Sequence, residues 1–351
     1  MRVLLVADVV GGAGTFVGEL TRALTVGETE VHLALLGPLR RRSEFQRLRA
    51  SSCELRDLRL EWMEEPWADV EAVGEWVEEL RELHRPDLIH MNTFAPVLSR
   101  AVPVLLTVHS CVLTWWRAVH GRPAPAAWAR YERLARAAIE RAELTVTPTR
   151  ALLSDLVAVY ERLPGARVIP NGRSVRQTDR PGADRQRLVV SAGRLWDEAK
   201  NVDLLAQAAG AIHGRVAVIG PGRVSGVDAL GALDSSAVLN WFSRAAVFAE
   251  PARYEPFGLA ALEAALCGCA LVLGDIPSLR EVWGEGATFV SPHDADALVH
   301  AVNRLLDDRI LRREAAARAF EVATRYSPAK MGSAYLDAYS HVVGAGAPAC
   351  T

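Results

Sequence analysis

The sequence predicts an α/β fold with two doubly wound domains, each a parallel sheet with helices on both faces. Short apolar segments alternate with amphipathic helical segments along most of the 351 residues, the pattern of successive βαβ units. The alternation occurs twice, separated by a polar stretch rich in Gly, Pro and Arg at 171–187. We expect domains over 1–170 and 171–327, with a last helix over 328–345 that returns to the first domain.

The N-terminal half begins with an apolar strand and a glycine-rich turn, Gly11–Gly14, which leads into a helix. The strands expected in this half are 3–7, 31–36, 88–90, 104–108 and 144–146. The helices expected are 16–24, 69–83 and 125–141, and a long loop is expected before Pro125. The helix at 69–83 places its apolar residues on one face, which indicates a side packed against the sheet.

The alternation resumes after the polar stretch. The strands expected there are 188–192, 216–219, 246–249 and 271–273. The helices expected are 201–209, 238–244, 258–266, 295–306, 311–323 and, after Ser327-Pro328, 331–343. Strands of a parallel sheet end at one edge, so the residues that follow them gather where open α/β sheets bind ligands.

The composition gives no sign of a nucleic-acid partner, a membrane-spanning segment or a disulfide framework. The formal net charge of −2 gives no reason to expect nucleic acid or an anionic membrane. No apolar run is long enough to span a membrane, and the first residues are interpreted as a strand, not a signal peptide. The five cysteines are odd in number and lack zinc-ligand spacing, which favours reduced, structural thiols and a cytoplasmic location.

The most informative segment reads EPARYEPFGLAALE, residues 250–263. Glu255 precedes an apolar helix and Glu263 lies about two turns inside it, with Phe257, Gly258 and Leu259 between them. N–H groups at the start of a helix lack internal partners and attract anions, and carboxylates accept hydrogen bonds from hydroxyls. The combination suits a nucleotide-sugar; a capping acid and an exposed helical glutamate are the structural alternative.

A second segment places two cations after a strand. It reads SAGRLWDEAKN and contains Arg194 and Lys200 at the edge where ligands bind. Only Lys200 and Lys330 are lysines among the 40 basic residues, so a lysine at 200 indicates a need for a compact ammonium. The two cations suit a pyrophosphate; alternatively they are surface cations paired with Asp197 or Glu198.

Further candidates follow other strands. Gly12 lies in a turn that favours contact with a phosphate or an acceptor, or is a plain tight turn; the dinucleotide-binding glycine pattern is not met in register. His109 ends a strand and is either a site residue or a hydrogen-bonded structural histidine. Trp115 and Trp116 either stack on a sugar-like acceptor or pack within the protein.

Two further motifs, one with a serine and one with two aspartates, lie where helices are expected to start. Ser278 follows a strand and either belongs to an anion site or caps the next helix. Asp294-Ala295-Asp296 has the form of a metal-binding motif of some sugar transferases, but it opens a helix, so we interpret it as a cap.

Taken in order along the chain, these segments resemble glycosyltransferase family 4, the retaining transferases of GT-B fold. The matching stretches are VADVVGGAGTFVGELTRAL, TVHS, VIPNGR, SAGRLWDEAKN, RYEPFGLAALEAALCGCALVLGDIPSLREVW and FVSPHDADALVHAVNRLL. The resemblance implies two Rossmann-like domains facing across a cleft, with the nucleotide-sugar on the C-terminal domain and the acceptor on the N-terminal one. The interval from Arg194 to Lys200 is six residues, one more than is usual in the family.

The resemblance also implies roles. Arg194 and Lys200 would stabilise the leaving diphosphate in place of a metal, so neither a metal nor a cofactor is expected. Glu263 would hold the ribose and Glu255 the donor sugar. The remaining implied contacts are N–H groups of Phe257, Gly258 and Leu259 toward sugar and phosphate, Ser278 at the donor, His109 near the acceptor and Gly12 by the phosphates.

The implied reaction is transfer of a hexose-type sugar, with retention, from a UDP-, GDP- or ADP-sugar to a hydroxyl acceptor. No amphipathic membrane-binding helix is evident, so a saccharide or a small polar acceptor is expected, without stable membrane insertion. A nucleotide-sugar epimerase of the same fold and an inactive binding subunit are the alternatives. A glycan phosphorylase would need a pyridoxal phosphate lysine, and Lys330 follows a proline in a late connecting segment.

Overall fold

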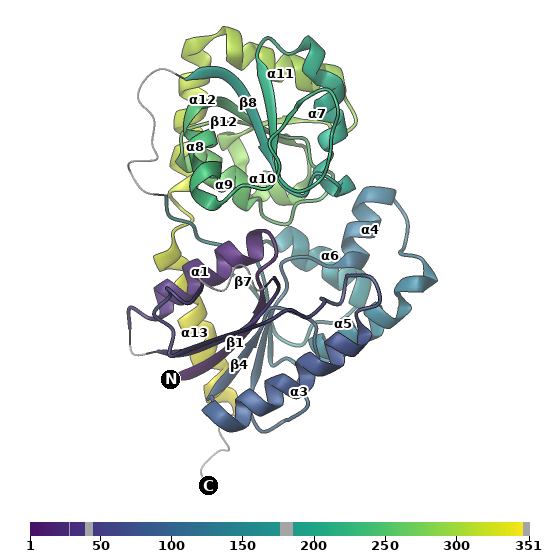
Figure 1. Ribbon diagram of the computed structural model, residues 1–351, viewed down its shortest axis with the longest axis vertical. Coiled ribbons are helices and arrows are strands. Elements are labelled where there is room, and N and C mark those ends of the chain that lie inside the picture. The colour runs from purple at the N-terminus through teal and green to yellow at the C-terminus, as the bar shows by residue number, and fades with distance from the viewer. Residues whose placement is uncertain (28, 39–44, 176–184, 347–351) are drawn as a thin grey trace. The chain divides into compact units, whose positions relative to one another are not determined.

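The computed structural model describes residues 1–27, 29–38, 45–175 and 185–346 (Figure 1). The chain divides into two compact units. The first unit comprises 1–117, 122–172 and 328–351, and the second comprises 118–121 and 173–327. Each unit contains one sheet, in which every pair of neighbouring strands is parallel.

Among the described residues, the sheet of the first unit has seven strands in the order β3-β2-β1-β4-β5-β6-β7. The strands are β1 (Arg2–Asp8), β2 (Glu30–Leu36), β3 (Ser52–Arg56), β4 (Leu88–Met91), β5 (Val104–Thr107), β6 (Leu144–Thr147) and β7 (Ala166–Val168). Val3 of β1 lies opposite Val31 of β2 and Leu88 of β4. The strand order changes direction between β1 and β4, which makes the gap beyond their carboxyl ends the switch point of this sheet.

Helices cover both faces of this sheet. They are α1 (Gly12–Leu24), α3 (Trp67–His84), α4 (Val112–His120), α5 (Ala129–Arg141), α6 (Arg150–Tyr160) and α13 (Pro328–Gly346), with a 3-10 turn η2 (Ala126–Trp128). Helices α1 and α13 lie side by side on one face (Figure 1) and share an apolar cluster with β1 and β2. Gly332 of α13 permits this closeness, because a Cβ atom there would lie 2.6 Å from that of Ala23.

A buried polar network ties α13 to the sheet. His90 on β4 is fully buried, and its Nδ1 bonds to the Tyr339 hydroxyl at 2.7 Å. Its Nε2 bonds to the Thr107 hydroxyl at 2.8 Å, and Thr107 in turn bonds to the Tyr335 hydroxyl at 3.0 Å. Burial lowers the pKa of His90 to about 3, so the ring is neutral at physiological pH.

Replacing Tyr339 with phenylalanine is expected to destabilise the protein by about 1–3 kcal/mol, because His90 Nδ1 would be buried without a partner. Urea unfolding followed by circular dichroism measures the loss. Tyr335→Phe is the matched control on the same helix; it should cost less, because Thr107 would keep His90 as a partner. Equal stability of the wild type and both variants would contradict this account.

In the part of the second unit that the structure describes, the sheet has six strands in the order β10-β9-β8-β11-β12-β13. They are β8 (Gln186–Ala192), β9 (Arg215–Ile219), β10 (Asp228–Ala229), β11 (Ala245–Glu250), β12 (Ala270–Gly274) and β13 (Thr288–Val290). Its helices are α7 (Val202–Ala208), α8 (Ser235–Arg244), α9 (Leu259–Leu266), α10 (Pro277–Trp283), α11 (Ala295–Asp307) and α12 (Arg309–Ala323). Short 3-10 turns occupy η4 (Glu198–Lys200), η5 (Ala209–Ala211) and η6 (Gly284–Gly286).

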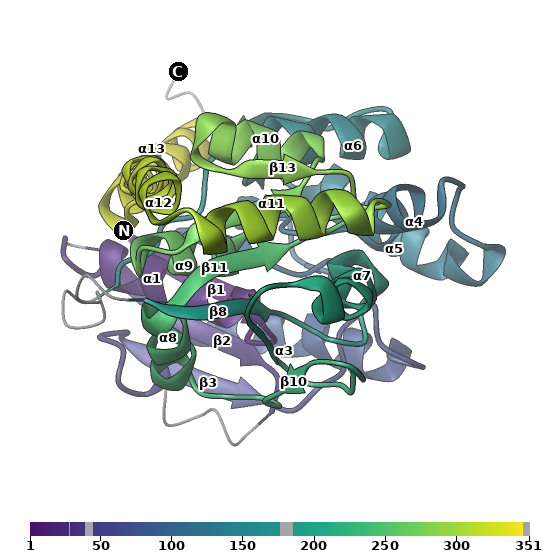
Figure 2. The same ribbon diagram turned by 90° about the horizontal axis from the view of Figure 1, so that it is seen from above.

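Two apolar clusters flank this second sheet. One contains residues of α8, α9, α10 and α12, and the other contains residues of α7 and α11. Strands β8 and β11 lie side by side in the middle of the sheet, as Figure 2 shows. The order of strands changes direction between these two, so their carboxyl ends form the switch point of the second unit.

The doubly wound fold that the sequence predicted is confirmed in both units, and the expected strands and helices occur with small shifts at their ends. The sequence reasoning omitted β3, α6, β7, β10 and β13. The expected loop before Pro125 is wrong in part, because Val112–His120 is helical and buries Leu113 and Thr114. The middle of the polar boundary stretch, 176–184, lies outside the described residues.

Within the described residues, Cys53, Cys111, Cys267 and Cys269 form no disulfide. The last two are fully buried on either side of Gly268, and Cys350 lies outside the described residues. Within the described ranges, no helix is both long enough and apolar enough to span a bilayer.

Candidate active site

The carboxyl ends of β8 and β11 bring together the two most informative sequence segments. The loop after β8 carries Arg194 and Lys200, and the loop after β11 carries Glu255. The loops are joined by their backbones, since the Arg253 N–H donates to the Ala199 carbonyl at 2.8 Å. Lys200 and Glu255, 55 positions apart in sequence, thus meet at the switch point, where α/β sheets bind ligands.

Lys200 lies between two carboxylates. Its Nζ donates to Glu250 Oε1 at 2.7 Å and to Glu255 Oε2. The side chain of Lys200 is 15% exposed and that of Glu250 only 1%. Burial alone would lower the pKa of Lys200, but Glu250 and Glu255 outweigh it and hold the pKa above its usual value. Lys200 is therefore a permanent ammonium at this edge of the sheet.

The two carboxylates have different surroundings. Burial and the nearby Glu255 raise the pKa of Glu250, although Lys200 opposes the shift. Burial also acts on Glu255, but Lys200 and the N–H groups of Gly258 and Phe257 outweigh it, so the pKa of Glu255 is lowered. Glu250 is thus the member of this pair that takes up a proton more readily.

Glu255 also organises the start of α9. Its Oε1 accepts hydrogen bonds from the N–H groups of Gly258 at 2.8 Å and Phe257 at 3.3 Å. Gly258 has a φ of 89°, a left-handed conformation that favours glycine. The resemblance assigned the N–H groups of Phe257, Gly258 and Leu259 to sugar and phosphate. In this structure the first two donate to Glu255, and contact of the three N–H groups with a ligand stays a prediction.

Ser278 supports Glu255 from α10. Its hydroxyl donates to the backbone carbonyl of Glu255 at 2.6 Å, so the residue lies beside the candidate site. The alternative that Ser278 caps the helix is wrong, because α10 begins at Pro277 with Ile276 in the capping position.

Asn201 fixes the loops around Lys200, and the sequence analysis did not single it out. Its backbone is left-handed, with a φ of 53°, a conformation that asparagine tolerates better than most residues. Its Nδ2 donates to the Pro251 and Pro292 carbonyls at 2.8 and 2.7 Å. Asn201 therefore joins the loops that follow β8, β11 and β13.

Arg194 and Glu263 are each held by a partner. Arg194 donates to Asp197 Oδ2 at 2.6 Å and is 37% exposed, so the pairing with Asp197 considered from the sequence does occur for Arg194. Glu263 Oε1 accepts from Arg173 Nε at 2.6 Å. Arg173 was missed because it lies in the polar boundary stretch, 90 positions from Glu263.

The other predicted residues belong to the first unit. Gly12 is the first residue of α1, after β1, and it is exposed. His109 follows β5 and packs edge-on against Phe16 of α1, with ring centroids 4.3 Å apart. Burial lowers the pKa of His109 to about 4, and its Nε2 is buried without a hydrogen-bond partner in the described residues. A neutral imidazole nitrogen is therefore available beside the start of α1.

Trp115 and Trp116 lie on α4 and are half-buried, with ring centroids 5.7 Å apart. Their rings are tilted by 58° to each other and do not form a flat stacked pair. Helical placement and partial burial favour packing for part of each ring, and the exposed remainder leaves contact with an acceptor open as a prediction.

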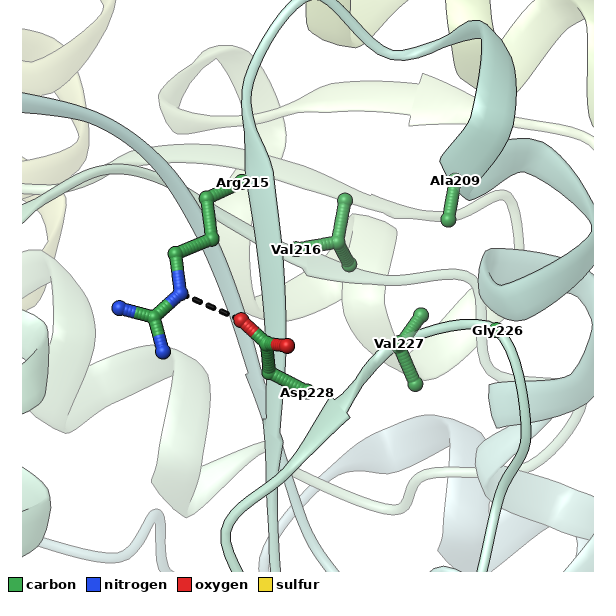
Figure 3. Close-up of a pocket in the computed structure, with 6 residues that line it drawn as sticks. All are labelled: Ala209, Arg215, Val216, Gly226, Val227 and Asp228. Carbon is green, nitrogen blue, oxygen red and sulfur yellow. Dashed lines mark hydrogen bonds and ion pairs between the residues drawn. The ribbon is translucent and has the colours of Figure 1, made fainter.

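Two further features of the second unit lie away from the switch point. The Asp294 side chain accepts from the Ala297 N–H at 2.8 Å, which confirms its interpretation as a helix cap. A hollow of about 410 Å³ (Figure 3) lies at the amino end of β9, opposite the candidate site. Its charged residues, Arg215 and Asp228, pair with each other. Across the described ranges, no three His, Cys, Asp or Glu side chains gather as metal ligands would.

Comparison with known families agrees with this architecture. Residues 10–177 match the family model described as Glycosyltransferase Family 4, and residues 186–308 match the model described as Glycosyl transferases group 1. The chain belongs to glycosyltransferase family 4. This family 4 chain has, in each of its two units, a parallel doubly wound sheet of the GT-B fold.

A curated relative of this family 4 chain is glycogen synthase of Mycobacterium tuberculosis, 44% identical over 93 residues. These cover 25% of this chain and 22% of that protein. The match spans about a quarter of the length of the first curated relatives.

Two solved structures share the fold of this family 4 chain. Sucrose-phosphate synthase (tll1590) from Thermosynechococcus elongatus has a TM-score of 0.80 at 19% identity, covering 99% of this chain and 100% of that one. Anabaena Alr3699/HepE in complex with UDP-glucose has a TM-score of 0.75 at 17% identity, covering 97% and 100%. The GT-B fold that the sequence resemblance implied is confirmed.

Proposed function

We propose that this chain transfers a hexose-type sugar from a nucleoside diphosphate-sugar to a hydroxyl acceptor, with retention of anomeric configuration and without a metal ion. The observation that carries the proposal is the buried ammonium of Lys200 beside Glu255 at the switch point of a family 4 chain. UDP-glucose, which Anabaena HepE holds in its complex, is a nucleotide-sugar of this class. GDP- and ADP-sugars are equally compatible with the residues described.

On the donor side, Lys200 and Arg194 would neutralise the diphosphate as it leaves. A cation placed where negative charge develops is a large contributor to catalysis, and two organic cations can replace a divalent metal in this role. Glu255 would accept from sugar hydroxyls, and Ser278 would hold the Glu255 backbone in place. Arg173 would orient Glu263 toward the ribose hydroxyls.

Among the residues of the first unit, Gly12 would lie by the donor phosphates and His109 would contact the sugar near the acceptor. Trp115 and Trp116 would contact the acceptor itself. The neutral His109 ring offers a hydrogen-bond donor or acceptor without adding charge. The departing phosphate oxygen would take the acceptor proton, so no separate general base is needed. A saccharide or a small polar molecule fits this proposal, and glycogen synthase is a relative named for a saccharide product.

The donor proposal is tested by thermal shift with UDP-, GDP- and ADP-sugars and the matching free diphosphates, all with EDTA. We expect the nucleotides of one of the three bases to raise the melting temperature of the protein. EDTA should leave that shift unchanged, because the proposed counter-charges are Lys200 and Arg194. A shift that EDTA abolishes would contradict metal independence. No shift with any donor or diphosphate would favour an inactive relative.

Transfer itself is tested with the selected donor and a panel of saccharide acceptors. Release of the free diphosphate only when acceptor is present would support transfer, and NMR of the anomeric proton in the product would report retention or inversion. Conversion of the donor sugar without any acceptor would favour the epimerase alternative.

A further inference from the structure

We infer that Glu250 is a positioning residue for Lys200, which holds the ammonium beside Glu255 and takes up a proton from solvent when a diphosphate binds. The inference rests on the proposed function, since it requires a diphosphate near Lys200. Sequence reasoning did not assign Glu250 a role, because the residue reads as the end of an apolar strand, β11.

The geometry places a cation on one oxygen of the Glu250 carboxylate. Its Oε1 accepts from Lys200 Nζ at 2.7 Å, and its Oε2 is buried without a hydrogen-bond partner among the described residues. The side chain is 1% exposed. A buried carboxylate oxygen without a partner disfavours the ionised form, so the surroundings of Glu250 tolerate a proton.

The ammonium of Lys200 has three N–H bonds. Two of them point to the carboxylates of Glu250 and Glu255. The third can donate to a phosphate oxygen while Glu250 holds the stem in place. Loss of Glu250 would leave Lys200 anchored on one side only, by Glu255.

The net charge around Lys200 explains why Glu250 should take up a proton when a diphosphate binds. Lys200, Glu250 and Glu255 together carry a net charge of −1 when both carboxylates are ionised. The charged groups facing Glu250 are Lys200 and Asp197 from the loop after β8, and Glu255 from the loop after β11; Asp197 is itself neutralised by Arg194. A diphosphate adds further negative charge, which raises the affinity of both carboxylates for a proton. Glu250 is the one of the two whose pKa is already raised.

The sign of the pH dependence follows. The pKa of Glu250 is raised by burial and by Glu255, and a bound diphosphate raises it further, so binding and protonation favour each other. Diphosphate affinity should increase as the pH falls toward the pKa of the unliganded group. At a pH low enough that Glu250 is protonated before binding, a further fall in pH should no longer increase the affinity for the diphosphate.

The test compares the wild type with Glu250→Gln, which keeps an acceptor for Lys200 but removes the charge and the proton site. Isothermal titration of UDP, GDP or ADP, whichever the thermal panel selects, is run in buffers of different ionisation enthalpy from about pH 5.5 to 8.5. We expect the wild type to take up more protons than E250Q, and E250Q to bind about tenfold more tightly at about pH 8, as for a one-unit pKa change. Glu285→Gln, an exposed carboxylate in η6, is the charge-matched control and should behave as the wild type.

Positioning is tested separately by kinetics. In Glu250→Leu the ammonium loses one of its two anchors and keeps only Glu255. The turnover number should therefore fall further in E250L than in E250Q, whose amide oxygen can still accept from Lys200. If E250L does not fold, the number of protons that E250Q takes up on diphosphate binding, compared with the wild type, still tests the inference. Equal proton uptake and equal pH profiles in the wild type and E250Q would overturn this inference but would leave the proposed function standing. A wild type that binds no diphosphate would overturn the proposed function and the inference with it.

Discussion

Replacing Lys200 with alanine should lower the turnover number for sugar transfer about 1,000-fold. A cation that stabilises charge developing on a leaving group acts in the transition state, and removing one such group commonly costs two to three orders of magnitude. Here the ammonium is 15% exposed and is held in place by two carboxylates. Initial rates of diphosphate release with the selected donor and acceptor would measure the loss.

The same substitution has a structural cost that must be separated from catalysis. Without the ammonium, Glu250 and Glu255 would be buried together with no cation between them, which costs about 3–5 kcal/mol for a buried pair. Adding Glu250→Gln to Lys200→Ala should restore part of the melting temperature without restoring turnover. Lys330→Ala, at the other lysine of the chain and exposed on α13, is the control. Near-normal turnover in a folded K200A protein would remove Lys200 from the mechanism.

Glu255 is expected to give the second large effect. Glu255→Ala should reduce kcat about 100- to 1,000-fold, because it removes a proposed sugar contact, a partner of Lys200 and the acceptor for the Gly258 N–H. Glu255→Gln keeps the shape and an acceptor for that N–H but loses the charge. It should therefore retain the melting temperature of the wild type better than E255A while remaining impaired in turnover.

The control for Glu255 is Glu198→Gln, an exposed carboxylate in the neighbouring turn η4. Its turnover and donor KM should match those of the wild type. If E255Q and E198Q were equally active, the charge of Glu255 would have no part in transfer. A selective rise in donor KM in E255Q would instead limit Glu255 to ground-state binding.

The sequence predicted the fold, and it marked the residues that meet at the centre of the candidate site, because both depend on local patterns. Alternating apolar segments specify parallel strands and helices, and the linear motif from 250 to 263 marks Glu255 and the start of α9. The omitted strands β3, β7, β10 and β13 are short and lie at or near sheet edges, where partial exposure weakens the apolar pattern.

The partners of the site residues could not be predicted in the same way. Glu250 meets Lys200 across 50 positions, and Arg173 meets Glu263 across 90. Such pairs depend on which strands become neighbours, and no local pattern encodes that. The motif also revealed the N–H groups of Phe257 and Gly258 without revealing that Glu255 itself accepts from them.

The placement of α13 has a consequence for synthesis. The second unit is almost continuous in sequence, whereas the first is completed by 328–351, whose Tyr335, Tyr339 and Val342 are fully buried in the core of the first unit. During synthesis on the ribosome, this face of the N-terminal sheet is therefore covered only in part, by α1, until α13 has emerged. Synthesis of the first unit thus begins before that of the second unit, and its core is completed after the second unit has been synthesised.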